Sequence, residues 1–205
     1  MRNKLEMYAE DRERLLLELR RQGWRAWVPA RLVRRAILLC GWRIERCYGM
    51  ASSLLGLCCP ESQVIQVPID FRQRLRVPET ARAVMNETLA HELGHLRLHA
   101  PALLKHQTKQ RGWEKEANDY ARVFLIPLLS LLNRLPMELL LKADDDVQRW
   151  RLVLRLADEF EVTGWFMGSA LEMYGLAQIS HRRRLVRVQP LAHELVRRFA
   201  FARTA

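Results

Sequence analysis

The sequence His-Glu-Leu-Gly-His at positions 91–95 constrains this chain more than any other feature. Residues 78–98 predict a helix, in which side chains four residues apart lie one turn above each other on the same face. His91 and His95 would then direct their imidazoles at one ion, with Glu92 close by, an arrangement typical of zinc peptidases. The same pattern also fits an amphipathic helix with two histidines at its polar edge. A third ligand would distinguish the two interpretations.

A second predicted helix, residues 113–127, offers that third ligand. Glu114 and Glu116 both lie in its first turn, which a chain reversal would bring towards the histidines. Glu114 is preferred because Asn118 follows one turn later on the same face and could accept a hydrogen bond from a histidine ligand. Glu116 has Tyr120 at the equivalent place and stays the alternative. Without a metal, both glutamates would still favour the positive end of the helix dipole.

These two segments carry a family resemblance. Two runs of residues together resemble the ImmA/IrrE family of bacterial metallopeptidases. The first, which ends at His99, is Thr-Leu-Ala-His-Glu-Leu-Gly-His-Leu-Arg-Leu-His, and the second, which begins at Glu114, is Glu-Lys-Glu-Ala-Asn-Asp-Tyr-Ala. Tyr120 stands where that family usually has phenylalanine, and Phe-Leu-Ile-Pro at 124–127 replaces Leu-Leu-Met-Pro. Neither change falls on a proposed ligand. The resemblance covers about residues 44–178.

The resemblance implies a metalloendopeptidase of the zinc hydrolase class. Zn2+, or another divalent ion such as Mn2+, would be held by His91, His95 and Glu114. The metal would polarise a bound water, and Glu92 would take its proton as the water attacks the scissile carbonyl. His99 continues the histidine face by another turn, and three roles stay open for it: support of a ligand, contact with substrate, or closure of the helix end.

The resemblance also implies a biological role. Members of this family cleave a transcriptional repressor and so induce mobile-element or stress-response genes. The residues before the first predicted strand do not resemble a DNA-binding domain. We therefore expect the repressor to be a separate helix-turn-helix protein encoded nearby. The alternative is a non-proteolytic regulatory protein that binds a repressor-like partner, with structural zinc or none.

The remaining patterns predict an α+β fold that is mostly helical. A small antiparallel three-stranded sheet would lie beside the zinc-site helix, and its edge could hold an extended substrate segment. After Pro127 the chain looks wholly helical, and two helices joined through Thr163 resemble a helix-turn-helix. Expected helices are 3–21, 29–40, 128–132, 136–141, 145–160 and 164–174, and expected strands are 43–48, 53–58 and 64–69. The expected segments are an N-terminal helical extension (1–40), a zinc metallopeptidase core (41–135), a helix-turn-helix-like subdomain (136–178) and a basic tail (179–205).

Composition limits the other function classes. The net charge of +11 would attract acidic partners, including nucleic acid. However, the helix that would read DNA begins with Trp165, Phe166 and Met167, which are poor side chains for base recognition, so direct DNA binding is not indicated. The chain lacks an apolar stretch of about 18 residues and a secretory signal. The four cysteines lack metal-binding spacing. We therefore expect a cytoplasmic protein.

Overall fold

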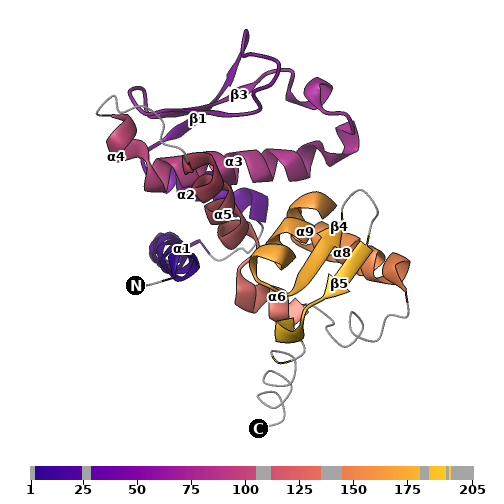
Figure 1. Cartoon of the computed structure of the whole chain (residues 1–205). Helices are drawn as coiled ribbons and strands as arrows, with labels where there is room; N and C mark the ends of the chain where they lie inside the picture. The colour runs from indigo at the N-terminus through magenta and orange to yellow at the C-terminus, as the bar shows by residue number, and fades with distance from the viewer. Residues whose placement is uncertain are drawn as a thin grey trace. The chain divides into compact units, whose positions relative to one another are not determined.

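Figure 1 shows the computed structural model of the chain, which describes residues 3–24, 29–104, 112–134, 145–180, 185–192 and 194. The chain forms two compact units, Met1–Leu125 and Ile126–Ala205. Within the described ranges, no helix combines the length and the apolar character needed to cross a membrane. The helix expected at 136–141 lies outside those ranges.

The first unit combines helices with one sheet, and the second combines helices with a β-hairpin. The first contains α1 (Lys4–Arg21), α2 (Pro29–Leu39), β1 (Arg43–Cys47), β2 (Leu57–Cys59), β3 (Val64–Pro68), η1 (Phe71–Arg74), η2 (Pro78–Thr80), α3 (Ala81–Leu98), α4 (Ala100–Leu103) and α5 (Trp113–Leu125). The second contains α6 (Leu128–Arg134), α8 (Asp146–Glu159), α9 (Gly164–Met173), β4 (Ala177–Ser180) and β5 (Leu185–Val188). The expected α+β class, dominated by helices, is confirmed.

Helix α3 is the central element of the first unit. It contacts α2, α5 and β2, and in Figure 1 the sheet lies on one side of it and α5 on the other. Leu89, Ala90 and Leu93 of α3 are completely buried. A helix covered on several sides is held by packing rather than by its intrinsic propensity. The candidate metal ligands of α3 therefore stand on a well-supported element.

The three-stranded sheet is mixed, and the prediction of an antiparallel sheet was wrong for one strand pair. Its order is β1-β3-β2, with β3 parallel to β1 and antiparallel to β2. Strands consecutive in sequence usually pair, but the loop 48–56 skips one strand position, and β3 later fills it. Val64, Ile65 and Val67 of β3 are buried, as expected for a central strand covered on both faces.

The strand expected at 53–58 is also wrong, because regular pairing begins only at Leu57. The preceding loop is held by a side chain instead of by a neighbouring strand. The Arg74 guanidinium donates hydrogen bonds to the carbonyl oxygens of Met50, Ala51 and Leu54 at 3.1, 2.7 and 3.2 Å. Carbonyl groups satisfied in this way have less need of a β-ladder.

Helix α1 packs on α5 and α2 and is fastened to the site-bearing helices by Asp11. Its carboxylate accepts hydrogen bonds from Arg97 Nε at 2.9 Å, from Arg97 Nη2, and from the Tyr120 hydroxyl at 2.7 Å. Burial favours a raised pKa for Asp11, but these hydrogen bonds outweigh it and lower the pKa. Burial and the neighbouring carboxylate together raise the pKa of Tyr120. The segment expected to be an extension is thus joined to the core.

The second unit contains the expected pair of helices, α8 and α9. Asp145 caps α8 by accepting a hydrogen bond from the Gln148 amide, and Thr163 caps α9 by accepting one from Phe166. The prediction that the chain is wholly helical after Pro127 was wrong, because β4 and β5 form an antiparallel hairpin. Leu-Val-Arg-Val in β5 has the two-residue alternation of a strand, although charged neighbours obscure it.

Candidate metal centre

The close approach of α3 and α5 depends on Gly94, inside the His-Glu-Leu-Gly-His motif. A Cβ atom added to Gly94 would lie 2.9 Å from both the Cα and the carbonyl oxygen of Ala117 on α5. Ala117 is itself completely buried. Gly94 follows His91 by three residues, and Ala117 follows Glu114 by three, so each small residue lies on the same helix face as a candidate ligand. The contact between small residues thus draws the first turn of α5 towards the histidines.

Three candidate ligands converge across this contact. The His91 Nε2 atom lies 3.2 Å from Oε2 of Glu114, and the His95 Nε2 atom lies 3.4 Å from Oε1 of the same carboxylate. The two Nε2 atoms are 3.1 Å apart. Among the described residues, these three form the group of histidine, cysteine and acidic side chains that could hold a metal ion. Glu116, the alternative, faces His99 instead.

These separations suit zinc. Ligand atoms about 2.0–2.2 Å from a tetrahedral ion lie roughly 3.3–3.5 Å from one another. The two nitrogens here are 3.1 Å apart, and each lies 3.2 or 3.4 Å from a different oxygen of Glu114. Two neutral imidazoles and one carboxylate are also a donor set that catalytic zinc sites use. The Glu114 side chain is 60% exposed, whereas that of His95 is 4% exposed. The group is therefore accessible from the carboxylate side.

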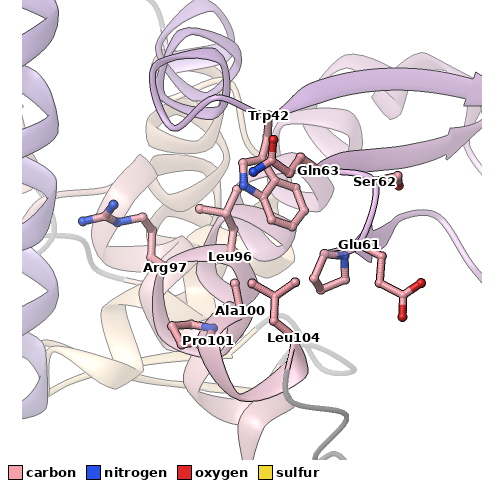
Figure 2. A pocket seen from close by; sticks show the side chains of 10 residues that line it. Trp42, Glu61, Ser62, Gln63, Leu96, Arg97, Ala100, Pro101 and Leu104 are labelled. Atoms are coloured by element: carbon pink, nitrogen blue, oxygen red, sulfur yellow. The ribbon is translucent and has the colours of Figure 1, made fainter.

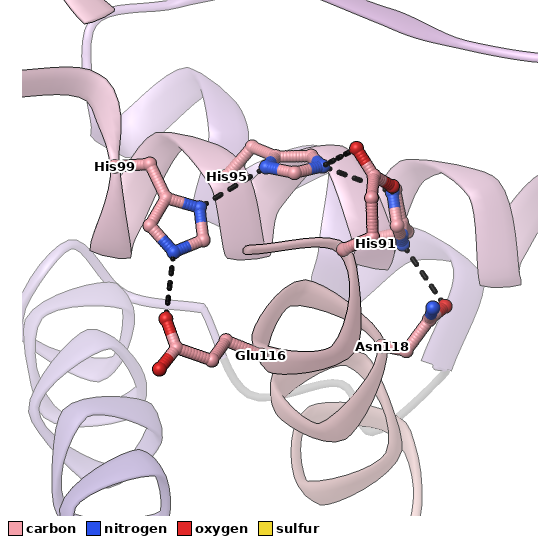
Figure 3. A network of polar contacts seen from close by, with 6 residues as sticks. His91, His95, His99, Glu116 and Asn118 are labelled. Carbon is pink, nitrogen blue, oxygen red and sulfur yellow. Dashed lines mark hydrogen bonds and ion pairs between the residues drawn. The ribbon is translucent and has the colours of Figure 1, made fainter. Parts of the chain in front are cut away.

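Both histidines have a polar partner behind them, and the partner of His91 sets which of its nitrogens carries the proton. The His91 Nδ1 atom lies 3.0 Å from Oδ1 of Asn118, and the His95 Nδ1 atom lies 3.1 Å from Nδ1 of His99 (Figure 3). Because Oδ1 of Asn118 only accepts, His91 must donate from Nδ1, which leaves a lone pair on its Nε2. The contact expected between Asn118 and a motif histidine is thus present.

The donor arrangement is suited to a cation. The Nε2 lone pair of His91 and the Glu114 carboxylate lie 3.2 Å apart, with Nε2 of His95 beside both. Electron-pair donors this close repel each other unless a proton or a cation lies between them. Protons on the two imidazoles would relieve this repulsion pair by pair, whereas one divalent cation would contact all three side chains at once. The residues present therefore fit a zinc ion.

Glu92 of the motif is 6% exposed and lies against the residue that precedes β2. A Cβ atom on Gly56 would lie 2.8 Å from Oε1 of Glu92 and 2.7 Å from Cγ2 of Thr88. Only glycine leaves room for both side chains at this point. The carboxylate that the sequence suggests as a base is thus enclosed between α3 and the start of an edge strand.

His99, the third histidine of the face, is buried, and it contacts His95 through Nδ1 while its Nε2 atom faces α5. Its Nε2 atom lies 3.0 Å from Oε2 of Glu116, whose other oxygen lies 2.6 Å from Nζ of Lys4. Hydrogen bonds from Lys4 and then His99 lower the pKa of Glu116. His99 also ends α3, since its backbone amide bonds to the His95 carbonyl oxygen at 2.8 Å.

A cavity of about 470 Å³ lies elsewhere in the first unit and is lined by none of the candidate site residues. Figure 2 shows Trp42 and Leu96 at its apolar part and Glu61 near its rim. Leu96 follows His95 directly and therefore lies on a different face of α3. The cavity is separate from the metal-ligand group and contributes nothing to its chemistry.

Four residues of the site could not be assigned from the sequence: Lys4, Gly56, Gly94 and Trp113, whose ring stacks on that of His99. Gly94 offered a weak signal, since a small residue inside a catalytic helix permits close helix packing. Lys4 offered none, because 112 residues separate it from Glu116. The sequence as a whole matches no family model and no curated protein.

Proposed function

We propose that this chain is a zinc-dependent endopeptidase of the ImmA/IrrE type. The observation that carries the proposal is the convergence of His91 Nε2, His95 Nε2 and the Glu114 carboxylate at separations of 3.1–3.4 Å. Glu92, which does not belong to this group of three residues, directly follows His91 in the sequence. Metal binding alone would not require Glu92. A second carboxylate, outside the ligand group, is what hydrolysis needs as a general base.

Each residue has a defined task in this proposal. Zinc, when bound, supplies Lewis acidity towards water and a carbonyl oxygen. Asn118 orients His91, and His99 contacts His95, so the lone pairs of both ligands stay directed at one point. The Glu92 carboxylate accepts the proton of the attacking water and passes it to the leaving amine. The enclosure of Glu92 against Gly56 limits its orientations.

The edge strand β2 offers a place for the peptide. Among the described residues, β2 lies at one edge of the sheet, with β3 as its neighbouring strand. An extended peptide can add to such an edge through main-chain hydrogen bonds. Gly56 connects the two features, because it immediately precedes β2 and contacts Glu92. A peptide bound there would pass close to the proposed base.

The proposed substrate is a separate helix-turn-helix repressor in the cytoplasm, cleaved to release repressed stress or mobile-element genes. This part of the proposal rests on the sequence resemblance. The composition of α9 supports a partner other than DNA for this chain, since Phe166 and Met167 are buried and the exposed Trp165 is not a base-reading side chain.

Co-expression with the helix-turn-helix protein encoded beside this chain tests the proposal. The native chain should remove the full-length partner, and Glu92→Gln should slow cleavage at least about 100-fold while zinc binding is kept, because a general base contributes that much. Glu79→Gln, an equal change at an exposed position on the approach to α3, is the matched control and should cleave normally.

Two results would reject the enzyme. Cleavage by Glu92→Gln at the native rate would remove the assigned base. A native chain that binds zinc and the partner yet leaves it intact would favour the non-proteolytic regulator.

A further inference from the structure

A chain of polar contacts runs from the metal-ligand group to the N-terminal helix. It passes from His95 Nδ1 to His99 Nδ1 at 3.1 Å, from His99 Nε2 to Glu116 Oε2 at 3.0 Å, and from Glu116 Oε1 to Lys4 Nζ at 2.6 Å (Figure 3 shows the first two contacts). These four residues come from α3, its C-terminal end, α5 and α1. All lie in the first compact unit.

The direction of each hydrogen bond follows from a metal on Nε2 of His95. A neutral imidazole carries one proton, so this histidine donates from Nδ1 to Nδ1 of His99. His99 then carries its own proton on Nε2 and donates it to Glu116, which as a carboxylate only accepts. Lys4 donates to the remaining oxygen of that carboxylate. Every partner can thus satisfy its role without conflict.

Packing holds His99 in the orientation that this chain needs. Its ring stacks on Trp113 with centroids 4.6 Å apart and planes 4° from parallel. His99 is 4% exposed and Trp113 is 7% exposed. Rotation of the imidazole would break the stack and leave buried nitrogen atoms without their partners, which costs more than the bonds contribute. His99 is therefore held by the stack on Trp113 and by contacts at both of its nitrogens.

We propose that His99, held by Glu116 and Lys4, is a positioning residue that keeps Nε2 of His95 directed at the metal, and that α1 is thereby part of the metal site. The inference rests on the proposed zinc site and adds to it. Hydrogen-bonded partners of metal-binding histidines commonly set their tautomer and ring orientation. The cation here comes from an exposed lysine, whose side chain is 68% exposed.

Zinc affinity measured by competition with a coloured chelator tests this role. His99→Phe keeps a ring that can stack on Trp113 but removes both nitrogens, and it should weaken zinc binding about 10- to 100-fold. His99→Asn keeps an acceptor close to the former Nδ1 and should restore most of that loss. The absorption spectrum of bound Co2+ should change in His99→Phe and remain native in His99→Asn, which a general packing defect would not produce.

Substitutions of two exposed lysines test whether α1 contributes to zinc affinity. Lys4→Met should weaken zinc binding about two- to five-fold, as expected for an exposed ion pair, and Lys4→Arg should recover it. Lys115→Met is the matched control, since Lys115 is exposed and pairs with Asp119 at 2.7 Å on its own helix. That variant should bind zinc as the native chain does.

Defined outcomes would overturn the inference. Native zinc affinity in His99→Phe refutes the positioning role, and equal affinities in Lys4→Met and Lys115→Met refute the part assigned to α1. A native chain that fails to bind zinc rejects the metal site itself. Zinc binding that responds to His99 without any cleavage rejects only the peptidase, so the two proposals fail separately.

Discussion

Gly94→Ala is the sharpest test of how the fold builds the metal centre. This substitution adds one methyl group between the two histidines of α3, at the place where α5 comes closest. The new Cβ would lie 2.9 Å from the Cα and the carbonyl oxygen of Ala117, and ordinary van der Waals contact begins at 3.4 Å. Both neighbouring atoms are backbone, so no side chain can rotate away. The helices must therefore separate by about half an ångström.

We expect Gly94→Ala to reduce zinc affinity more than it reduces the stability of the fold. Overpacking costs about 1–3 kcal/mol, but alanine favours a helix over glycine by about 1 kcal/mol, so the net loss of stability should be about 0–2 kcal/mol. Glu114 moves with α5, while His91 and His95 move with α3. Metal sites tolerate displacements of only about 0.5 Å, so we expect zinc affinity to fall about ten-fold or more.

The assay is zinc competition together with thermal unfolding of the metal-free chain. Gly164→Ala serves as the control, because the Cβ added there meets only the end of the Leu154 side chain, which can move, and lies in the other unit. Its zinc affinity should equal that of the native chain. Native zinc affinity in Gly94→Ala would refute the argument that helix spacing sets the ligand geometry.

Three further perturbations have defined outcomes. Asp11→Asn should destabilise the first unit by about 1–3 kcal/mol at pH 7, because it weakens charged hydrogen bonds to Arg97 and Tyr120. The pKa of Asp11 is lowered by folding, so this contribution is complete above about pH 4 and is lost as the pH falls through the folded pKa. The free energies of unfolding of the native and variant chains, measured by urea titration from pH 7 to 3, should therefore converge. A difference that stays constant with pH would contradict this. Removal of zinc by a chelator should lower the thermal midpoint of the native chain, since free zinc at 100 times its Kd adds about 2.7 kcal/mol; an unchanged midpoint would argue against a bound metal. Thr163→Ala should destabilise the second unit by about 1 kcal/mol through loss of the α9 cap to Phe166, measured by denaturant unfolding, and should leave zinc affinity unaltered.

The sequence predicted those features that depend on local patterns. The helix at 3–21 was recognised by its periodicity, and Asn3, which was expected as its first residue, caps it. Thr163, the predicted cap of the helix at 164–174, does accept the capping hydrogen bond. Glu114 and Asn118 could be placed on one helix face because they are four residues apart. Helical spacing is a short-range property, so one sequence is enough to read it.

Long-range features could not be read in the same way. The sequence Val64–Pro68 alone does not predict parallel pairing with β1, because that pairing depends on the path of the loop 48–56. The strand β5 was missed because Arg187 interrupts a short apolar run, and basic residues surround it. The partner and the register of each strand cannot be read from its own sequence, so both depend on the assembled fold.

The N-terminal helix shows why a segment that looks like an appendage can belong to a site. Asp11 joins Arg97 of α3 to Tyr120 of α5, and Arg12 donates a hydrogen bond from Nε to the Phe124 carbonyl oxygen at 2.9 Å. Those contacts fix α1 against the two helices that carry the candidate ligands. Because α1 is fixed, Lys4 in its first turn stays within hydrogen-bond distance of the Glu116 carboxylate on α5. A helix without those contacts would hold this ion pair only part of the time. The proposed role of α1 in orienting His95 therefore depends on the same helix packing that attaches α1 to α3 and α5.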